Sequence, residues 1–240
     1  MRATAHTYLD RLDDECTLTG DAAHHLQRVR RVRAGEVLTG ADGHGRWRIY
    51  DVVANHADGG ARGLALRATS EVIREPHLTP ALTVAFALTK GERPELAVQK
   101  LTELGVDTIV LMRAARSVVK WDDAKATTAI TRLRAIAREA GAQSRRARLP
   151  VLDGPVLPSA FAGRVGLLVG DGRGVAAHEL VLPTSGEWVI MIGPEGGFDA
   201  TELEQFGDAP RVAVGPFVLR AETAALAVAS AVAGRRRAER

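Results

Sequence analysis

The chain has 240 residues, 46% of them hydrophobic and 25% charged, which is typical of a globular protein with one large domain or two small ones. Its single cysteine, Cys16, excludes an intrachain disulfide and favours a reducing cytoplasm. The N-terminus has no signal-peptide pattern, and no apolar run approaches the ~20 residues of a membrane helix. We therefore expect a soluble, cytoplasmic protein.

The net charge of +3 is unevenly distributed along the chain. Residues 76–150 carry 13 basic and seven acidic side chains, whereas residues 1–75 carry 11 of each. Only four of the 32 basic residues are lysine, and the guanidinium group of arginine suits planar contacts to phosphate. Coding bias produces the same enrichment, so composition alone does not establish a nucleic-acid ligand.

The first 75 residues read as a small β-rich unit. Short apolar stretches at 37–39, 47–53 and 63–68 are broken by glycine-rich turns at 42–45 and 58–60, a spacing that predicts a small barrel. The segment 74–80 contains two prolines and forms the predicted domain boundary.

Beyond residue 76 the pattern changes to alternating strands and helices, which predicts a largely parallel sheet covered by helices. The expected strands are residues 82–88, 108–112, 165–169, 188–192 and 211–214. The expected helices are residues 94–104, 124–140, 201–206 and 222–234, the first with proline at an early position where its missing N–H costs little. The terminal cluster 235–237 reads as a solvated tail.

Several common functional signatures are absent. The stretch LLVGDGRG (167–174) looks like the start of a Rossmann-type fold, but the ~65 residues that follow are too few for the rest of that fold. No metal-ligand spacing, phosphate-binding loop or GxSxG elbow is found. These absences weaken the case for metal-dependent, hydrolytic and NTP-driven chemistry.

Two glycine-rich turns stand out instead. MIGPEGGF (191–198) and VGPFVLRAETAAL (214–226) each begin as an apolar β-type run that stops at a turn. Two strand ends of this kind present backbone amides to one ligand in an open α/β sheet, so the pair indicates a nucleotide-like cofactor. Taken singly, each glycine-rich turn is of a kind that commonly ends a strand or helix and has no function of its own. Residues 220–233 are equally typical of an amphipathic helix with solvated charges at its start.

Five ordered motifs resemble the bacterial ribosomal RNA small-subunit methyltransferase E family. They are QKLTELGV (99–106), RSVVK (116–120), EAGAQSRR with LP (139–146 and 149–150), IGPEGGF (192–198) and LRAETA (219–224). The stretch from His24 to Glu36 is similar to that family's N-terminal domain, so the resemblance covers nearly the whole chain. The chain departs from the family pattern at Arg30, at Glu36 and at 216–218, and the last departure leaves the contacts of that loop open.

The resemblance implies a fold and an activity. The fold would be α/β: a PUA-like β-barrel RNA-binding domain at 1–75, then a SPOUT methyltransferase domain at 76–240 with a C-terminal trefoil knot. Knots are nearly absent from proteins, so this expectation rests on the resemblance alone. The activity would be S-adenosylmethionine-dependent methylation of N3 of a uridine in small-subunit (16S) ribosomal RNA.

The cofactor would bind among three loops at strand ends, where small side chains let the backbone approach adenine. The residues implied are Val169, Gly170, Ile192, Gly193, Pro194, Glu195, Gly196, Gly197, Val214, Gly215, Val218 and Leu219.

Uridine N3 is a poor nucleophile until its proton leaves, so the reaction needs a base and a group that stabilises charge on the ring oxygens. Glu222 and Arg220 are the candidates for these two roles. The structural alternative for the pair is a salt bridge or helix-start charge.

Basic residues in the matched motifs and in the first domain are candidate phosphate contacts. Each of them, taken singly, also reads as part of a solvated surface. They are Arg28, Arg30, Arg31, Arg33, Lys90, Arg116, Lys120, Arg145 and Arg146.

The expected partners are small-subunit ribosomal RNA, within the assembled subunit, and a second copy of the chain; no metal or membrane is expected. Two alternatives remain open at this point. One is a SPOUT enzyme that methylates another RNA atom, such as a ribose 2′-oxygen. The other is a non-catalytic RNA-binding assembly factor with a decayed cofactor site, which the intact GPEGG and LRAETA motifs disfavour.

Overall fold

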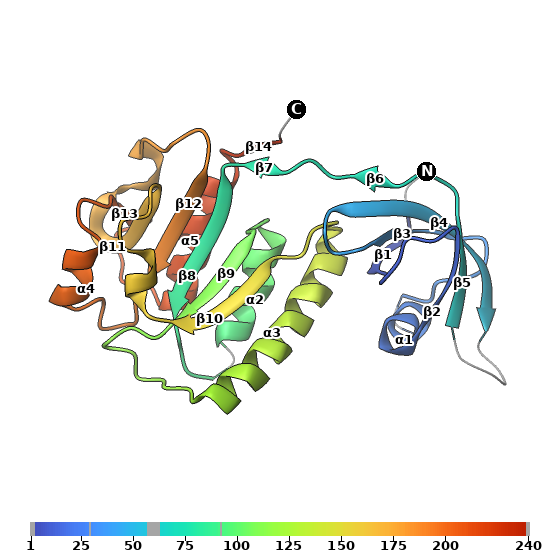
Figure 1. The fold of residues 1–240 in the computed structure, drawn as a ribbon, viewed down its shortest axis with the longest axis horizontal. Helices are drawn as coiled ribbons and strands as arrows, with labels where there is room; N and C mark the ends of the chain where they lie inside the picture. The colour runs from blue at the N-terminus through green and yellow to red at the C-terminus, as the bar shows by residue number, and fades with distance from the viewer. Residues whose placement is uncertain (1–2, 29, 57–62, 92, 239–240) are drawn as a thin grey trace. The chain divides into compact units, whose positions relative to one another are not determined.

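The structure is a computed structural model that describes residues 3–28, 30–56, 63–91 and 93–238. The chain forms two compact units (Figure 1). The first comprises Met1–Pro76 together with Gly141–Leu149, and the second comprises His77–Ala140 and Pro150–Arg240. The expected turn at 58–60 lies outside the described residues. No helix in the described ranges has the length and apolar character needed to cross a membrane.

The first unit is a curled, open sheet with one short helix. Its elements are β1 (Ala5–Tyr8), β2 (Glu15–Thr19), α1 (Gly20–Arg28), β3 (Val37–Ala41), β4 (Arg46–His56), β5 (Gly63–Ala68) and β6 (Ile73–Arg74). The strand order is β1-β3-β4-β5-β2, and β6 pairs with β4. Leu38, Tyr50 and Leu64 are fully buried between the sheet and α1. The right-handed twist of the strands curls the sheet around this apolar core, which also includes Ala23 and Leu26 of α1.

The segment Gly141–Leu149 belongs to this first unit although it begins inside the last turn of a long helix, residues 123–144, that starts in the second. The main-chain N–H of Leu149 donates to the Gly43 carbonyl at 2.9 Å, and Ala147 packs in a small apolar cluster with Tyr8 and Ala41. The first unit is therefore assembled from two separate stretches of sequence, a feature that the pattern of prolines and glycines does not reveal.

The second unit is built on a six-stranded parallel sheet. Its strands are β8 (Ala81–Ala87), β9 (Thr108–Met112), β10 (Val151–Val156), β11 (Leu167–Ala176), β12 (Glu187–Ile192) and β13 (Arg211–Ala213), in the order β10-β9-β8-β12-β11-β13. Its helices are α2 (Arg93–Glu103), α3 (Asp123–Ser144, whose last residues lie in the first unit), α4 (Ala200–Gln205), α5 (Ala221–Ala233) and the short 3-10 turns η1 (Pro158–Phe161) and η2 (Ala177–Glu179).

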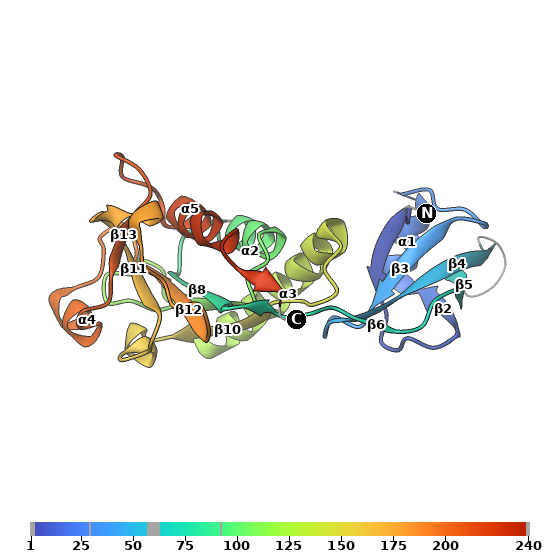
Figure 2. The same cartoon turned by 90° about the horizontal axis from the view of Figure 1, so that it is seen from above.

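Two apolar layers enclose the sheet. On one face the central strands pack against α2, α3 and α5, and α2 lies beside α5 (Figure 2). On the other face Val110, Val189 and Met191 contact Phe198 and Phe206, which lie before and after α4. Both faces are covered, so strands β8, β9 and β12 read as continuous apolar runs rather than as alternating ones.

The expected strands and helices of the second unit are present, with shifts of a few residues at their ends. β10 was not expected. β11 begins at Leu167 rather than at residue 165 and continues beyond the glycine loop. The helix α3 extends to Ser144 and is followed by Arg145 at φ 59°, a left-handed conformation that ends a helix. β13 is three residues long.

The interpretation of residues 235–237 as a solvated tail is wrong at Arg236, whereas Arg235 and Arg237 are exposed. Arg236 is 6% exposed, and its guanidinium donates to the carbonyls of Pro80 (2.7 Å) and Gly105 (2.8 Å) and pairs with Asp107. The following residues form β14 (Arg237–Ala238), which pairs with β7 (Leu78–Thr79). A run of three arginines looks solvated in sequence because nothing local predicts the carbonyl groups that gather around the middle one.

Candidate functional site

Three loops follow neighbouring parallel strands at one edge of the second sheet. The strands are β12, β11 and β13, and they lie side by side in that order. Because the strands are parallel, their carboxyl ends meet at the same edge, which is where ligands bind in open α/β sheets. The arrangement thus brings together the three segments that the family resemblance implied for one cofactor.

The first loop is a bulge inside β11. Val169 is buried, and its N–H donates to the carbonyl of Pro210 at 2.9 Å. The pairing with β13 shifts between Gly170 and Val175, so the intervening residues leave the ladder. A Cβ on Gly170 would lie 2.5 Å from Cδ1 of Ile192, so a glycine lets the first and second loops approach closely.

Asp171 fixes the shape of this bulge. Its carboxylate accepts a hydrogen bond from the Arg173 N–H at 2.9 Å and pairs with Arg211 of β13 at 3.1 Å. The backbone N–H and the Arg211 guanidinium hold the pKa of Asp171 below its ordinary value, because both favour the ionised form. Gly174 passes directly over the backbone of Arg211, where a Cβ would overlap the main chain.

The second loop is the turn from Gly193 to Gly197. The Gly197 N–H donates to the carbonyl of Pro194 at 2.8 Å, and Gly197 has φ +68°, which favours glycine. A Cβ on Gly193 would lie 3.2 Å from the Phe198 ring. Pro194 is buried, whereas Glu195 and Gly196 are exposed. The turn therefore exposes its middle residues to solvent, while Gly193 and Pro194 at its start are tightly packed.

Two contacts hold this turn against the segment after β9. Nη1 of Arg116 donates to the Gly196 carbonyl at 2.8 Å. The Ala115 N–H donates to Oε1 of Glu202, whose other oxygen accepts from the N–H of Asp199 in the capping box of α4. The structure thus uses Arg116, a predicted phosphate contact, to bind the second loop.

The third loop runs from Val214 to Leu219 and leads into α5. Gly215 has open space where a Cβ would lie. Phe217 is 81% exposed and Val218 is 99% exposed, while Val214 and Leu219 are half-buried. Arg220 is the N-cap residue of α5, with an exposed side chain that makes no capping hydrogen bond. The apolar tip of this loop is the part where the sequence departs from the family pattern.

Glu222 lies in the first turn of α5, and its side chain is 7% exposed. Oε1 lies 3.6 Å from Nε of Arg93, and Oε2 is buried without a hydrogen-bond partner among the described residues. Nη1 of Arg93 also donates to Glu195 at 3.0 Å. One guanidinium at the start of α2 therefore joins the second loop to the first turn of α5.

Sequence reasoning missed Arg93. It precedes Pro94 at the start of a helix, and no local pattern distinguishes it from a solvated charge at a helix end. The expected companion of Glu222 was Arg220, but no contact between these two side chains is seen in the described part of the chain.

The other predicted basic residues fall in both units. Lys90 and Lys120 are exposed in the second unit, near the ends of β8 and β9. In the first unit four exposed arginines lie on and after α1, and Arg31 there has φ 53°. They are Arg28, Arg30, Arg31 and Arg33.

Arg145 and Arg146 take part in packing within the first unit. Nη2 of Arg145 donates to the Ala3 carbonyl at 2.7 Å. The carbonyl of Arg146 accepts from the Tyr8 hydroxyl at 2.7 Å and from Nε2 of His6 at 3.1 Å. Burial lowers the pKa of His6 to about 4, since the charged imidazolium loses its solvent there. The Arg145 side chain is exposed, whereas Arg146 is half-buried.

Comparison with known proteins identifies the type of domain. Residues 76–233 match the family model described as an RNA methyltransferase domain, and residues 18–55 match an RNA methyltransferase PUA domain. The fold and the site thus define an α/β RNA methyltransferase of the SPOUT class with an N-terminal PUA domain, as the motifs led us to expect.

Individual relatives agree over nearly the full length. A ribosomal RNA small subunit methyltransferase E from Mycobacterium tuberculosis is 39% identical over 94% of this chain and 89% of its own length. The protein of that name from Bacillus subtilis is 30% identical over 90% of this chain and 88% of its own. The chain belongs to the ribosomal RNA small subunit methyltransferase E family.

Two solved structures share the fold. A Legionella pneumophila protein in complex with the cofactor S-adenosylmethionine matches with a TM-score of 0.82 at 26% identity, covering 98% of both chains. A methyltransferase E from Neisseria gonorrhoeae bound to S-adenosylmethionine matches with a TM-score of 0.79 at 25% identity, covering 95% of this chain and 96% of its own.

Proposed function

We propose that this protein transfers a methyl group from S-adenosylmethionine to N3 of a uridine in small-subunit ribosomal RNA. Two observations carry the proposal. Three glycine-containing loops lie at one edge of the sheet, and the helix that follows the third loop carries in its first turn a buried carboxylate, Glu222, with one oxygen free of hydrogen bonds among the described residues. The full-length similarity to methyltransferase E proteins supports the choice of substrate.

The three loops fit a nucleoside cofactor held by main-chain groups. Gly215 leaves open space on the third loop, and Gly170 and Gly193 allow close approach between the loops and their neighbours. We assign cofactor contacts to the set named from the sequence: Val169, Gly170, Ile192, Gly193, Pro194, Glu195, Gly196, Gly197, Val214, Gly215, Val218 and Leu219. When bound, S-adenosylmethionine supplies an electrophilic methyl group next to a positively charged sulfur.

Glu222 is assigned the role of the general base that removes the proton from uridine N3. Its free oxygen accepts the N3 proton while Arg93 pairs with the other oxygen. The electron pair of the N–H bond then stays on N3, which can attack the methyl carbon of the cofactor. The exposed guanidinium of Arg220, at the start of the same helix, is assigned to the ring oxygens on which negative charge develops. In this scheme Arg93 is a positioning residue for Glu222.

RNA contacts are assigned to both units. Lys90, Arg116 and Lys120 lie in the second unit, and Arg116 contacts the second cofactor loop. The first unit contributes Arg28, Arg30, Arg31, Arg33, Arg145 and Arg146, and their positive charge attracts the phosphate backbone without reading sequence. The assembled small subunit, located in the cytoplasm, is the proposed form of the substrate.

A homodimer is the proposed state in solution. Phe217 and Val218 expose large apolar side chains at the tip of the third loop, and such side chains mark interaction surfaces. Light scattering on the wild-type protein should give twice the chain mass of 25.6 kDa. Val218→Asp should shift the mass toward one chain; a wild-type monomer at micromolar concentration contradicts the dimer.

The test of the reaction uses small ribosomal subunits from cells without this protein. Incubation with the protein and S-adenosylmethionine should add one methyl group, mapped to uridine N3 by mass spectrometry of the nucleosides. A methyl group on a ribose 2′-oxygen would instead indicate the other SPOUT reaction. RNA binding without cofactor binding or methyl transfer would indicate an assembly factor.

A further inference from the structure

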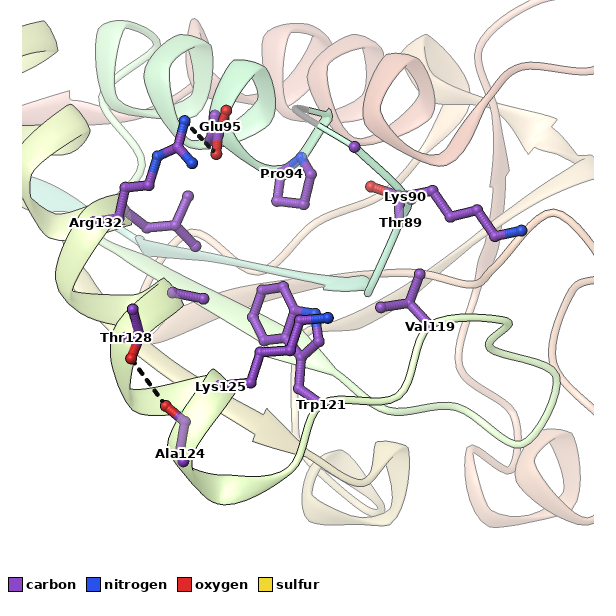
Figure 3. A pocket seen from close by; sticks show the side chains of 13 residues that line it. Thr89, Lys90, Pro94, Glu95, Val119, Trp121, Ala124, Lys125, Thr128 and Arg132 are labelled. Atoms are coloured by element: carbon purple, nitrogen blue, oxygen red, sulfur yellow. Dashed lines mark hydrogen bonds and ion pairs between the residues drawn. The ribbon is translucent and has the colours of Figure 1, made fainter.

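A cavity of about 680 Å³ opens in the second unit between the starts of α2 and α3 (Figure 3). Its walls come from the end of β8, the segment after β9 and the first turns of the two helices. The lining residues that matter here are Thr89, Lys90, Trp121, Lys125 and Arg132. The volume is within the range of small-molecule sites in proteins. Only Lys90 belongs to the site named from the sequence.

One wall of the cavity is apolar and partly aromatic. Trp121 is half-buried against the main core, and Val119 and Leu133 lie in the same wall. In Figure 3 the side chain of Lys125 is drawn across the indole ring, with Val119 to its right. A tryptophan face of this kind stacks with a nucleobase, because every base presents a flat π surface.

The rim of the cavity carries excess positive charge. Arg132 pairs with Glu95 at 3.1 Å, so these two charges offset each other (Figure 3). The ammonium groups of Lys90 and Lys125 have no carboxylate partner within the described ranges of the chain. Two free cations beside an aromatic wall suit a phosphorylated, ring-containing ligand.

Thr89 presents a buried polar group whose hydrogen bond a ligand would complete. It is 4% exposed, it forms part of the cavity wall, and its hydroxyl oxygen is buried without a hydrogen-bond partner among the residues described. Buried hydroxyl groups are almost always hydrogen-bonded, since an unmade bond is costly. A hydroxyl both donates and accepts, and so it can bind the polar edge of a base.

The cavity and the proposed methyl-transfer site share one edge of the sheet. Thr89 follows β8, which pairs in parallel with β12, and the second cofactor loop follows β12. Arg93 starts α2 next to the cavity and contacts both Glu195 and Glu222. When an RNA strand places one base at Glu222, its neighbouring nucleotides therefore lie close enough to enter this cavity.

We propose that this cavity binds one unpaired nucleotide of the RNA substrate, with its base stacked on Trp121 and hydrogen-bonded to Thr89, and its phosphate near Lys90 and Lys125. The proposal deepens the function proposed above and rests on it for the identity of the ligand as RNA. The nucleotide must be unpaired, because a base stacked inside a duplex cannot reach an aromatic wall. The cavity would thereby position the RNA for reaction.

A direct binding test does not depend on catalysis. Uridine 5′-monophosphate is titrated into the wild-type protein, and the intrinsic fluorescence is compared with that of Trp121→Phe, which leaves Trp47 and Trp188 in place. Saturable quenching should occur in the wild type and be lost in Trp121→Phe. Ribose 5-phosphate and inorganic phosphate at the same concentrations should not quench. Equal quenching by inorganic phosphate, or quenching that persists in Trp121→Phe, overturns the proposal.

A kinetic test places the cavity in the reaction. Trp121→Leu should raise KM for small subunits about 5- to 150-fold, the factor that corresponds to loss of one stacked base at ~1–3 kcal/mol. Trp121→Phe should restore most of the affinity, and Thr89→Val and Lys125→Ala should each raise KM. The Kd for S-adenosylmethionine should stay at the wild-type value, which excludes misfolding of the methyltransferase unit.

The matched control is Lys100→Ala, which removes a lysine that pairs with Glu103 on α2, outside the cavity. It should leave KM unchanged. If the wild type methylates RNA and Trp121→Leu does so with the same KM, the cavity proposal fails while the proposed function stands. If the wild type transfers no methyl group to RNA, the proposed function fails, and the fluorescence titration still decides whether the cavity binds a nucleotide.

Discussion

Nε of Arg93 lies 3.6 Å from Oε1 of Glu222, and this contact leaves the other carboxylate oxygen buried and free of hydrogen bonds among the described residues. The side chain of Arg93 is 35% exposed and that of Glu222 is 7% exposed, so the pair lies at the border between core and solvent. A carboxylate with one oxygen held and one oxygen available can exchange a proton with a bound ligand while keeping its orientation.

The first prediction concerns this free oxygen. Glu222→Gln keeps the shape of the side chain but removes its ability to accept the N3 proton. We expect the single-turnover rate of methyl transfer to fall about 10²- to 10⁴-fold, the usual contribution of a general base, with cofactor and RNA binding retained. Raising the pH should partly restore the rate, because hydroxide then removes the proton from N3. Glu204→Gln, on the exposed side of α4, is the control and should react at the wild-type rate. Near-normal turnover by Glu222→Gln would leave Glu222 with a structural role only.

The second prediction concerns Arg93 as a positioning residue. Arg93→Met removes the cation that faces Glu195 and Glu222 while keeping most of the side-chain volume. We expect a loss of about 1–2 kcal/mol in unfolding free energy, because a buried carboxylate loses its partner. Methyl transfer should slow as well.

A double-mutant cycle with Glu222→Gln, measured by urea unfolding and by single-turnover rate, separates the two effects. The losses in the double variant should be smaller than the sum of the single losses, since both changes break the same contact. Additive losses would show that Arg93 acts on something other than Glu222.

The third prediction uses two glycines two positions apart in the first loop. A Cβ on Gly174 would overlap the backbone of Arg211, whereas a Cβ on Gly172 would meet nothing within 4 Å. Gly174→Ala should therefore lower the melting temperature by several degrees and weaken S-adenosylmethionine binding by calorimetry, because backbone must move. Gly172→Ala is the matched control. If both variants bind and melt alike, the crossing of the bulge over β13 does not shape the cofactor site.

The fourth prediction concerns pH and His6. Its pKa is about 4 in the folded protein, whereas the ordinary value for a solvated histidine is 6.5, so the unfolded chain binds a proton that the folded chain does not. The associated stability is present above pH 6.5 and is lost as the pH falls from 6.5 to about 4. The total is about 3 kcal/mol.

Thermal unfolding of the wild type and of His6→Gln between about pH 7.5 and pH 4 measures this effect. The melting temperature of the wild type should fall more steeply across that window than that of His6→Gln, which has no imidazole to protonate. Parallel curves for the two proteins would mean that His6 titrates normally.

The sequence was sufficient for the architecture of the second unit because its strands are continuous apolar runs bounded by glycine. The run at 108–112 became β9 with the expected bounds, and the turn at 193–197 follows a buried strand as expected. β10 was missed, since Gly154 and Pro155 lie inside it and read as a turn. The family motifs in turn identified the fold of both units, which the matches to known proteins confirm.

Contacts between distant segments could not be read from the sequence. Arg236 resembles its two neighbours in composition, and only the fold brings the Pro80 and Gly105 carbonyls to its guanidinium. Likewise, nothing in the sequence around Arg93 predicts its contact with Glu222. Thr89 and Trp121 were also passed over, because a single threonine or tryptophan next to a helix is ordinary until a cavity is seen around it.

The membership of Gly141–Leu149 in the first unit has a consequence for the order in which the protein is made. A ribosome that has finished residue 76 has produced the strands of the first unit but not Ala147 and Leu149, which pack with Tyr8 and Trp47. N-terminal domains generally fold first as the chain emerges. Here the N-terminal sheet lacks part of its packing until the residues after α3 have been synthesised, so the first unit reaches its final packing only after His77–Ala140 of the methyltransferase unit has left the ribosome.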